Sequence, residues 1–209
     1  MGTTVIIEEK AFLGVLLAAV EAFPGRFYGE RKPKGATAEG EVHGLLFGQR
    51  IQRNDGDVVF NVTLTVPNQI VLERTHDGIS VAAKHINKIR EAIELFPAYS
   101  LLGFFHSHPY PADEFKKCSS VEPSETDRDS AISSAEQEEE EMLDLIFSIT
   151  RLKRPTWILP QFPKPYLIHA SCGVYKYTLA CYSAVTSEHE ESYGAVDNLI
   201  CTTAAGLQA

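Results

Sequence analysis

The stretch LLGFFHSHP at residues 101–109 joins a wholly apolar run to two closely spaced histidines. The apolar run, residues 101–105, is typical of a strand that is buried on both faces in the middle of a sheet. On an extended chain residues i and i+2 point to the same face, so His106 and His108 are expected to leave the end of this strand together. Two neighbouring imidazoles can bind one metal ion. The alternative is a pair of polar side chains that hydrogen-bond at a strand terminus.

Helical and strand-like patterns alternate on both sides of this stretch. Helices are predicted over residues 10–22, 80–96 and 124–141. Further strands are predicted over residues 42–47, 58–66 and 143–149, and in a hairpin of residues 166–170 and 174–183. Asp55-Gly56 predicts a tight turn between two of these strands, and Gly173 the turn of the hairpin. This order predicts an α/β (α+β) fold, with a mixed β-sheet flanked by helices in a single domain.

Polar segments interrupt this pattern at two places, residues 24–40 and 110–122, which we interpret as insertions. The domain is expected to span residues 1–183. From residue 184 to residue 209 the chain is polar and rich in small residues, and no structure is predicted for this C-terminal tail.

The composition is that of one ordinary globular domain of 209 residues. A formal net charge of −9 argues against a nucleic-acid partner. Four cysteines form no CxxC pair, which argues against a thiol-based zinc finger. The apolar run at residues 11–20 is too short to span a bilayer and follows acidic rather than basic residues. We therefore expect a cytoplasmic protein without a membrane partner.

A second motif, Ser124-Glu-Thr-Asp127, begins the third predicted helix. Ser-x-x-Asp is usually a capping box. The serine side chain caps the helix, and the aspartate side chain three residues later accepts a hydrogen bond from the serine backbone N–H. The same geometry places Asp127 on the first helical turn, where its carboxylate can supply a third metal ligand. Both interpretations can hold together.

A third feature is Glu41, a charged residue at the start of the apolar strand over residues 42–47. Gly40 and Gly44 flank it and would allow close backbone approach. A solvated carboxylate at a strand end is the simpler interpretation. His43 shares the face of Glu41 and is expected to be structural.

Together these three segments resemble the JAB/MPN domain family, and specifically its JAMM metalloproteases. The resemblance extends over roughly residues 5 to 183, and the matching positions are Glu41, His106, Ser107, His108, Pro109, Ser124 and Asp127. One departure is the segment 109–123, which is longer than in the family and could gate a substrate. Within it, Asp113 is a weaker rival to Asp127, and Cys118 is expected to be a free thiol.

The resemblance implies a zinc-dependent metallopeptidase with one Zn²⁺ per chain. His106, His108 and Asp127 would be the ligands, Glu41 the general base and Ser124 the donor to the oxyanion. Ser107 would order its neighbours or point away from the metal. The implied substrate is an isopeptide or peptide bond at the C-terminus of ubiquitin, or of a ubiquitin-like or sulfur-carrier protein.

Two alternatives stay open. Many members of the family are non-catalytic interaction modules, but these usually lack some of the ligands. A phage-associated or cell-wall-associated JAB peptidase would carry the same motif.

Overall fold

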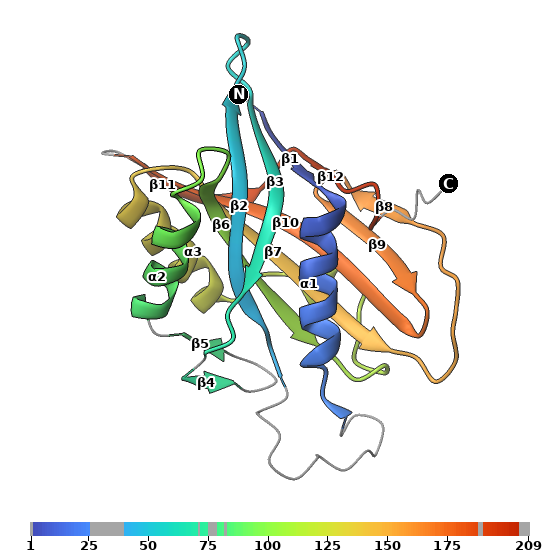
Figure 1. The fold of residues 1–209 in the computed structure, drawn as a ribbon. Coiled ribbons are helices and arrows are strands. Elements are labelled where there is room, and N and C mark those ends of the chain that lie inside the picture. The colour runs from blue at the N-terminus through green and yellow to red at the C-terminus, as the bar shows by residue number, and fades with distance from the viewer. Residues whose placement is uncertain are drawn as a thin grey trace.

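A computed structural model describes residues 2–25, 40–70, 72–74, 79–81, 83–187 and 190–204. Within these ranges the strands form one curled, mixed sheet of ten strands and a separate two-stranded ribbon (Figure 1). The sheet contains β1 (Thr3–Ile7), β2 (His43–Gln52), β3 (Val58–Pro67), β6 (Ser100–Pro109), β7 (Met142–Arg151), β8 (Gln161–Lys164), β9 (Leu167–Cys172), β10 (Tyr175–Ser187), β11 (Glu190–Ala195) and β12 (Asn198–Ile200). The ribbon pairs β4 (Glu73–Arg74) with β5 (Ile79–Ser80). The predicted mixed α/β architecture is confirmed.

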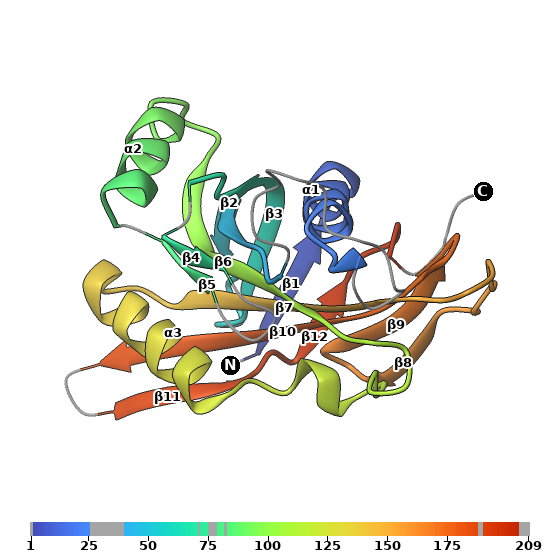
Figure 2. The same cartoon turned by 90° about the horizontal axis from the view of Figure 1, so that it is seen from below.

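Three helices accompany the sheet in the described part of the chain: α1 (Glu9–Glu21), α2 (Ala83–Ile93) and α3 (Glu125–Glu138). Figure 2 shows α1 and α3 on opposite sides of the sheet. The apolar side of α1 packs into the main core, where Phe12 contacts Phe147 of β7 and Tyr177 of β10. The opposite face of the sheet is covered by α3 and by a short 3₁₀ turn, η2 (Ser119–Val121).

The central strand β6 pairs with β2 antiparallel and with β7 parallel. Leu102 and Phe105 are fully buried, as the apolar run predicts, whereas Leu101 and Phe104 are half-buried and line a cavity. A Cβ atom at Gly103 would lie 2.1 Å from the carbonyl oxygen of Leu143, so only glycine allows this close approach of β6 and β7. The strand differs from the prediction at its end, because it continues through both histidines to Pro109. Ladder pairing with β7 holds both histidines in an extended backbone, and β2 also pairs with His106.

The second predicted helix forms but packs differently from the other two. None of the residues of α2 is fully buried, and just after the helix Leu95 and Phe96 are 80% and 60% exposed. Its half-buried isoleucines therefore do not pack into the main core of the sheet. Figure 2 shows α2 and α3 as two separate helices near the same edge of the sheet.

Two segments for which no regular structure was predicted are ordered by long-range contacts. The predicted insertion 110–122 contains η2, and its Phe115, Ser120 and Val121 are buried. The predicted tail contains the end of β10 together with β11 and β12, which pair with β10 and β1. The sheet therefore extends beyond residue 183. Most of the predicted insertion 24–40 lies outside the described residues.

None of the helices in the described ranges has both the length and the apolar character that crossing a membrane requires.

Candidate metal centre

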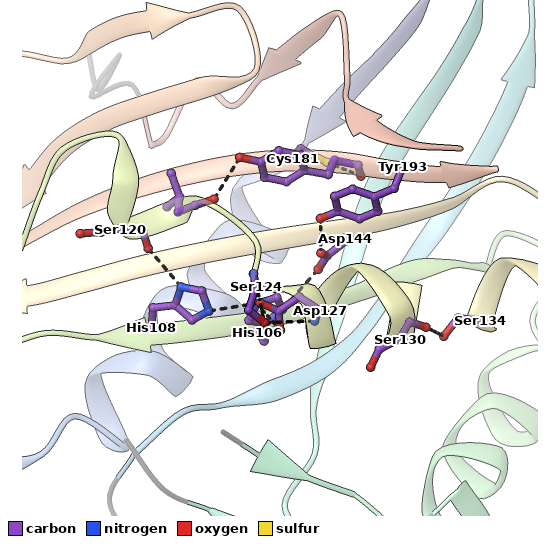
Figure 3. Close-up of polar contacts among 12 residues, drawn as sticks. His106, His108, Ser120, Ser124, Asp127, Ser130, Ser134, Asp144, Cys181 and Tyr193 are labelled. Atoms are coloured by element: carbon purple, nitrogen blue, oxygen red, sulfur yellow. Dashed lines mark hydrogen bonds and ion pairs between the residues drawn. The ribbon is translucent and has the colours of Figure 1, made fainter. Parts of the chain in front are cut away.

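Two elements bring the predicted ligands together (Figure 3). His106 and His108 project from the same face of β6, with ring centroids 4.9 Å apart. Asp127 approaches them from the first turn of α3, with Oδ1 3.6 Å from His106 Nε2 and Oδ2 4.0 Å from His108 Nε2. One ligand-type atom from each residue lies within 4.8 Å of the other two. The predicted convergence of these three side chains is confirmed.

The position of Asp127 follows from the way α3 begins. Ser124 is the N-cap, and its Oγ accepts a hydrogen bond from Asp127 N at 3.2 Å. In return Asp127 Oδ2 accepts from Ser124 N at 2.8 Å, which completes the predicted capping box. The aspartate thus caps the helix and faces the histidines at the same time.

Both imidazoles face Asp127 with Nε2 and have Nδ1 on the opposite side of the ring. His106 Nδ1 lies 3.2 Å from Asp144 Oδ1, and His108 Nδ1 lies 3.1 Å from the carbonyl oxygen of Ser120. Because these acceptors hold an N–H at Nδ1, Nε2 is in each ring the nitrogen that faces the cluster and could ligate a metal. His106 Nε2 is buried and has no hydrogen-bond partner. A buried ring nitrogen without a hydrogen-bond partner fits a bound cation, and two imidazoles with one carboxylate are a donor set that zinc accepts.

The charges around the cluster favour a cation. Burial opposes protonation of His106, but Asp144, followed by Asp127 and Glu41, outweighs it and raises the pKa to about 9. Burial and the charge of His106 lower the pKa of His108 to about 4. Near neutral pH the metal-free pair therefore carries one positive charge, on His106, while His108 is neutral. A metal ion that displaced the added proton of His106 would satisfy the same carboxylates.

Asp127 stays ionised beside this pair. Burial opposes its charge, but His106 and the hydrogen bonds from Ser124 lower the pKa of the carboxyl below its usual value. An ionised carboxylate is the form that ligates a metal.

Glu41 lies beside the cluster without belonging to it. Its side chain lines the same cavity as the three ligand candidates and is only 8% exposed. His43 pairs with His106 in the ladder, so continuing this antiparallel register by two residues brings Glu41 opposite His108. Val42 is held there by two hydrogen bonds to Ser107, from Ser107 N at 2.8 Å and to Ser107 Oγ at 2.9 Å. Ser107 thus points away from the cluster and fastens the Glu41 segment to β6.

Ser124 and His43 complete the wall near Glu41. In this structure the Ser124 hydroxyl donates to Asp127 Oδ2 at 2.7 Å, so a substrate oxygen would have to compete for it. His43 Nδ1 lies 2.8 Å from Asn68 Nδ2, and its ring packs against Phe104. Burial, reinforced by His106, lowers the pKa of His43 to about 4, so this imidazole is neutral.

The cluster opens into a cavity of about 1160 Å³ between α2 and α3. Ile86 and Arg90 of α2 line one wall, and Ser134 and Glu138 of α3 line the other. The Arg90 guanidinium contacts the Glu138 carboxylate across the cavity.

Three contributors were not singled out from the sequence: Asp144, Ser120, and Tyr193, whose hydroxyl donates to Asp144 Oδ2 at 2.7 Å. Asp144 carried a usable signal, since it is a charged residue inside the apolar strand MLDLIFSIT. Ser120 acts through its backbone carbonyl, which no residue pattern reveals. Asp113, considered as a rival ligand, is exposed and lies outside the ligand cluster.

Comparisons of the sequence with protein-family models and with curated proteins find no match. The chemistry of this centre therefore has to be inferred from its own side chains.

Proposed function

We propose that this protein is a zinc-dependent metallopeptidase of the JAMM type. Its substrate would be the isopeptide or peptide bond at the C-terminus of ubiquitin or of a ubiquitin-like or sulfur-carrier protein. The observation that carries the proposal is the convergence of His106, His108 and Asp127 on one point of a cavity that Glu41 also lines. Three protein ligands with one open position are the arrangement of catalytic zinc sites, whereas structural sites are closed by four.

The proposed reaction assigns one task to each residue. The zinc ion would be held by His106, His108 and Asp127. As a Lewis acid it would lower the pKa of water toward about 7. Glu41 would accept a proton from the attacking water and pass it to the leaving amine. Ser124 would turn its hydroxyl from Asp127 to the oxyanion that forms on the substrate carbonyl.

The size and lining of the cavity support a protein substrate. Pockets for small molecules usually enclose about 300–1000 Å³, and this cavity of about 1160 Å³ is larger. Apolar side chains such as Ile86, Leu101 and Phe104 alternate with polar ones along its walls. An extended peptide tail presents the same mixture of apolar side chains and backbone polar groups.

The test combines metal analysis with a panel of ubiquitin and ubiquitin-like fusions. We expect about one zinc per chain, and hydrolysis that stops with a chelator and returns with zinc. Glu41→Gln should abolish hydrolysis and keep zinc, whereas His106→Ala should lose both. Glu125→Gln is the matched control, because Glu125 is exposed at the start of α3 and does not line the cavity.

The outcomes separate the candidate functions. Zinc binding without any hydrolysis that depends on Glu41 would indicate a non-catalytic interaction module. Cleavage of cell-wall peptides but of no ubiquitin-like fusion would indicate the other JAB peptidase class. A chain that binds no zinc would contradict the proposal.

A further inference from the structure

A buried carboxylate stands directly behind one of the metal-ligand candidates. Asp144 lies near the start of β7, is almost completely buried, and places Oδ1 3.2 Å from His106 Nδ1 (Figure 3). Its second oxygen, Oδ2, accepts a hydrogen bond of 2.7 Å from the hydroxyl of Tyr193. Tyr193 belongs to β11, in the segment for which no structure was predicted. A continuous chain of polar contacts therefore runs from β11 to His106.

The other histidine is held from the same side of the sheet. His108 Nδ1 contacts the carbonyl oxygen of Ser120, and the next carbonyl, that of Val121, accepts from the Tyr182 hydroxyl at 3.0 Å. Tyr182 and Tyr193 stack on each other, with ring centroids 5.5 Å apart and planes 12° apart. The polar contacts behind the two imidazoles thus both lead to the stacked pair of Tyr182 in β10 and Tyr193 in β11.

These contacts have a defined chemical effect. A carboxylate that accepts from Nδ1 selects the tautomer whose Nε2 can ligate, and it holds the ring in one orientation. The Tyr193 hydroxyl occupies Oδ2, so the carboxylate is held with Oδ1 toward the ring. Burial and the neighbouring Asp144 raise the pKa of Tyr193, which keeps its hydroxyl a donor.

We propose that Asp144 and Tyr193 are positioning residues of the metal centre, and that β11 thereby sets metal affinity without supplying a ligand. This inference rests on the proposed metal site. Removal of such supporting partners typically lowers metal affinity about 10- to 100-fold. We expect an effect near the upper end for Asp144→Asn and about 10-fold for Tyr193→Phe.

Tyr177→Phe is a matched control on the opposite face of the sheet. The Tyr177 hydroxyl donates to the carbonyl oxygen of Ala204 at 2.8 Å, so the same substitution there also removes one buried hydrogen bond. Tyr177 packs in the main core with Phe12 and Phe147, away from the metal centre. Both variants should lose some thermal stability, but only Tyr193→Phe should change metal binding.

The experiment measures Zn²⁺ affinity by competition with a chromophoric chelator, and the visible spectrum of the Co²⁺-substituted protein. Weaker Zn²⁺ binding and an altered Co²⁺ spectrum in Tyr193→Phe, with wild-type values in Tyr177→Phe, would support the inference. Wild-type affinity and spectrum in Tyr193→Phe would overturn it while leaving the proposed function intact. A wild-type chain that binds neither ion would overturn both. If Asp144→Asn does not fold, Tyr193→Phe still decides the question, because it retains the ring and its stacking.

Discussion

The two helices that flank the cavity are held in opposite ways. On one side, α3 places Ala131 and Ala135 against β7 and β10 and begins with a complete capping box. On the other, α2 has no buried residue, and its Arg90 contacts Glu138 of α3. The helix that carries a ligand candidate is packed, whereas the helix that would meet a substrate is not. The comparison suggests that rigidity is concentrated where distances within a metal cluster matter.

The largest expected effect comes from Asp127, which has two tasks on the packed side. Asp127→Asn should lose zinc and reduce hydrolysis by more than about 10³-fold, since metal ions supply several kcal/mol of stabilisation to a transition state. The amide oxygen can still accept from Ser124 N, so thermal stability in chelator should stay near that of the wild type. Asp127→Ala should also lose the cap, at about 1 kcal/mol.

Zinc content and thermal unfolding check this prediction, with Asp129→Asn as the exposed control on the same helix. Full zinc content in Asp127→Asn would show that the carboxylate serves only as a helix cap.

Substitution of Ser124 also distinguishes a catalytic role from helix capping. Ser124→Ala should reduce the rate of hydrolysis about 10²- to 10³-fold if the hydroxyl stabilises an oxyanion. The same change should cost about 1 kcal/mol of stability through the lost cap. Ser133→Ala, in an exposed position of the same helix, is the control for both readouts. A stability loss with an unchanged rate would restrict Ser124 to capping.

A paired substitution on the two helices tests the contrast between them directly. Ile86→Ala on α2 should raise KM about 10-fold, because lost apolar contact with a substrate costs about 1–3 kcal/mol. Since Ile86 is not fully buried, its stability change should be small. Ala135→Leu on α3 should cost about 1–3 kcal/mol of stability, because the site is fully buried and has no room. Equal destabilisation by both changes would remove the distinction between the helices.

A further prediction concerns the pH dependence of the metal-free protein. His43, His108 and His169 have pKa values of about 4 when folded, below the ordinary 6.5, so their stabilising contribution is lost as pH falls from 6.5 toward 4. His106, at about 9, contributes stability that is present below pH 6.5 and is lost as pH rises through 9. Thermal unfolding in chelator should therefore show maximal stability near pH 6.5, and His106→Gln should flatten the alkaline side. An alkaline side that stays unchanged in this variant would contradict the assigned charge state.

Local sequence was sufficient wherever neighbouring residues act on each other. The spacing of His106 and His108 and the Ser124–Asp127 capping box each span four residues or fewer, and both occur as predicted. The apolar run at 101–105 also identified the central strand, although the strand extends further. Short-range geometry of this kind is determined by the backbone of a strand or of a helical turn.

The pairing of β11 with β10 could not be predicted from the sequence, for a physical reason. The segment that holds β11 is polar and has no apolar period, so its ordering comes from the ladder to β10 rather than from its own pattern. In α2 the apolar period correctly predicts a helix, but periodicity does not say whether the apolar side meets a core or a cavity. Asp144 was visible as a charge in an apolar strand, yet its partners come from other strands.

The sequence by itself determined the chemical types available at the centre, the extended backbone beneath two imidazoles, and the capped turn that carries Asp127. Only the tertiary structure decided that the strand with the two imidazoles meets the helical turn with Asp127. It also decided that Glu41 borders them and that Asp144 and Ser120 orient the two rings. The reason is that a hydrogen bond or a metal cluster requires correct distances between segments far apart in the chain. Those distances are set by sheet register and core packing, which depend on all the strands together.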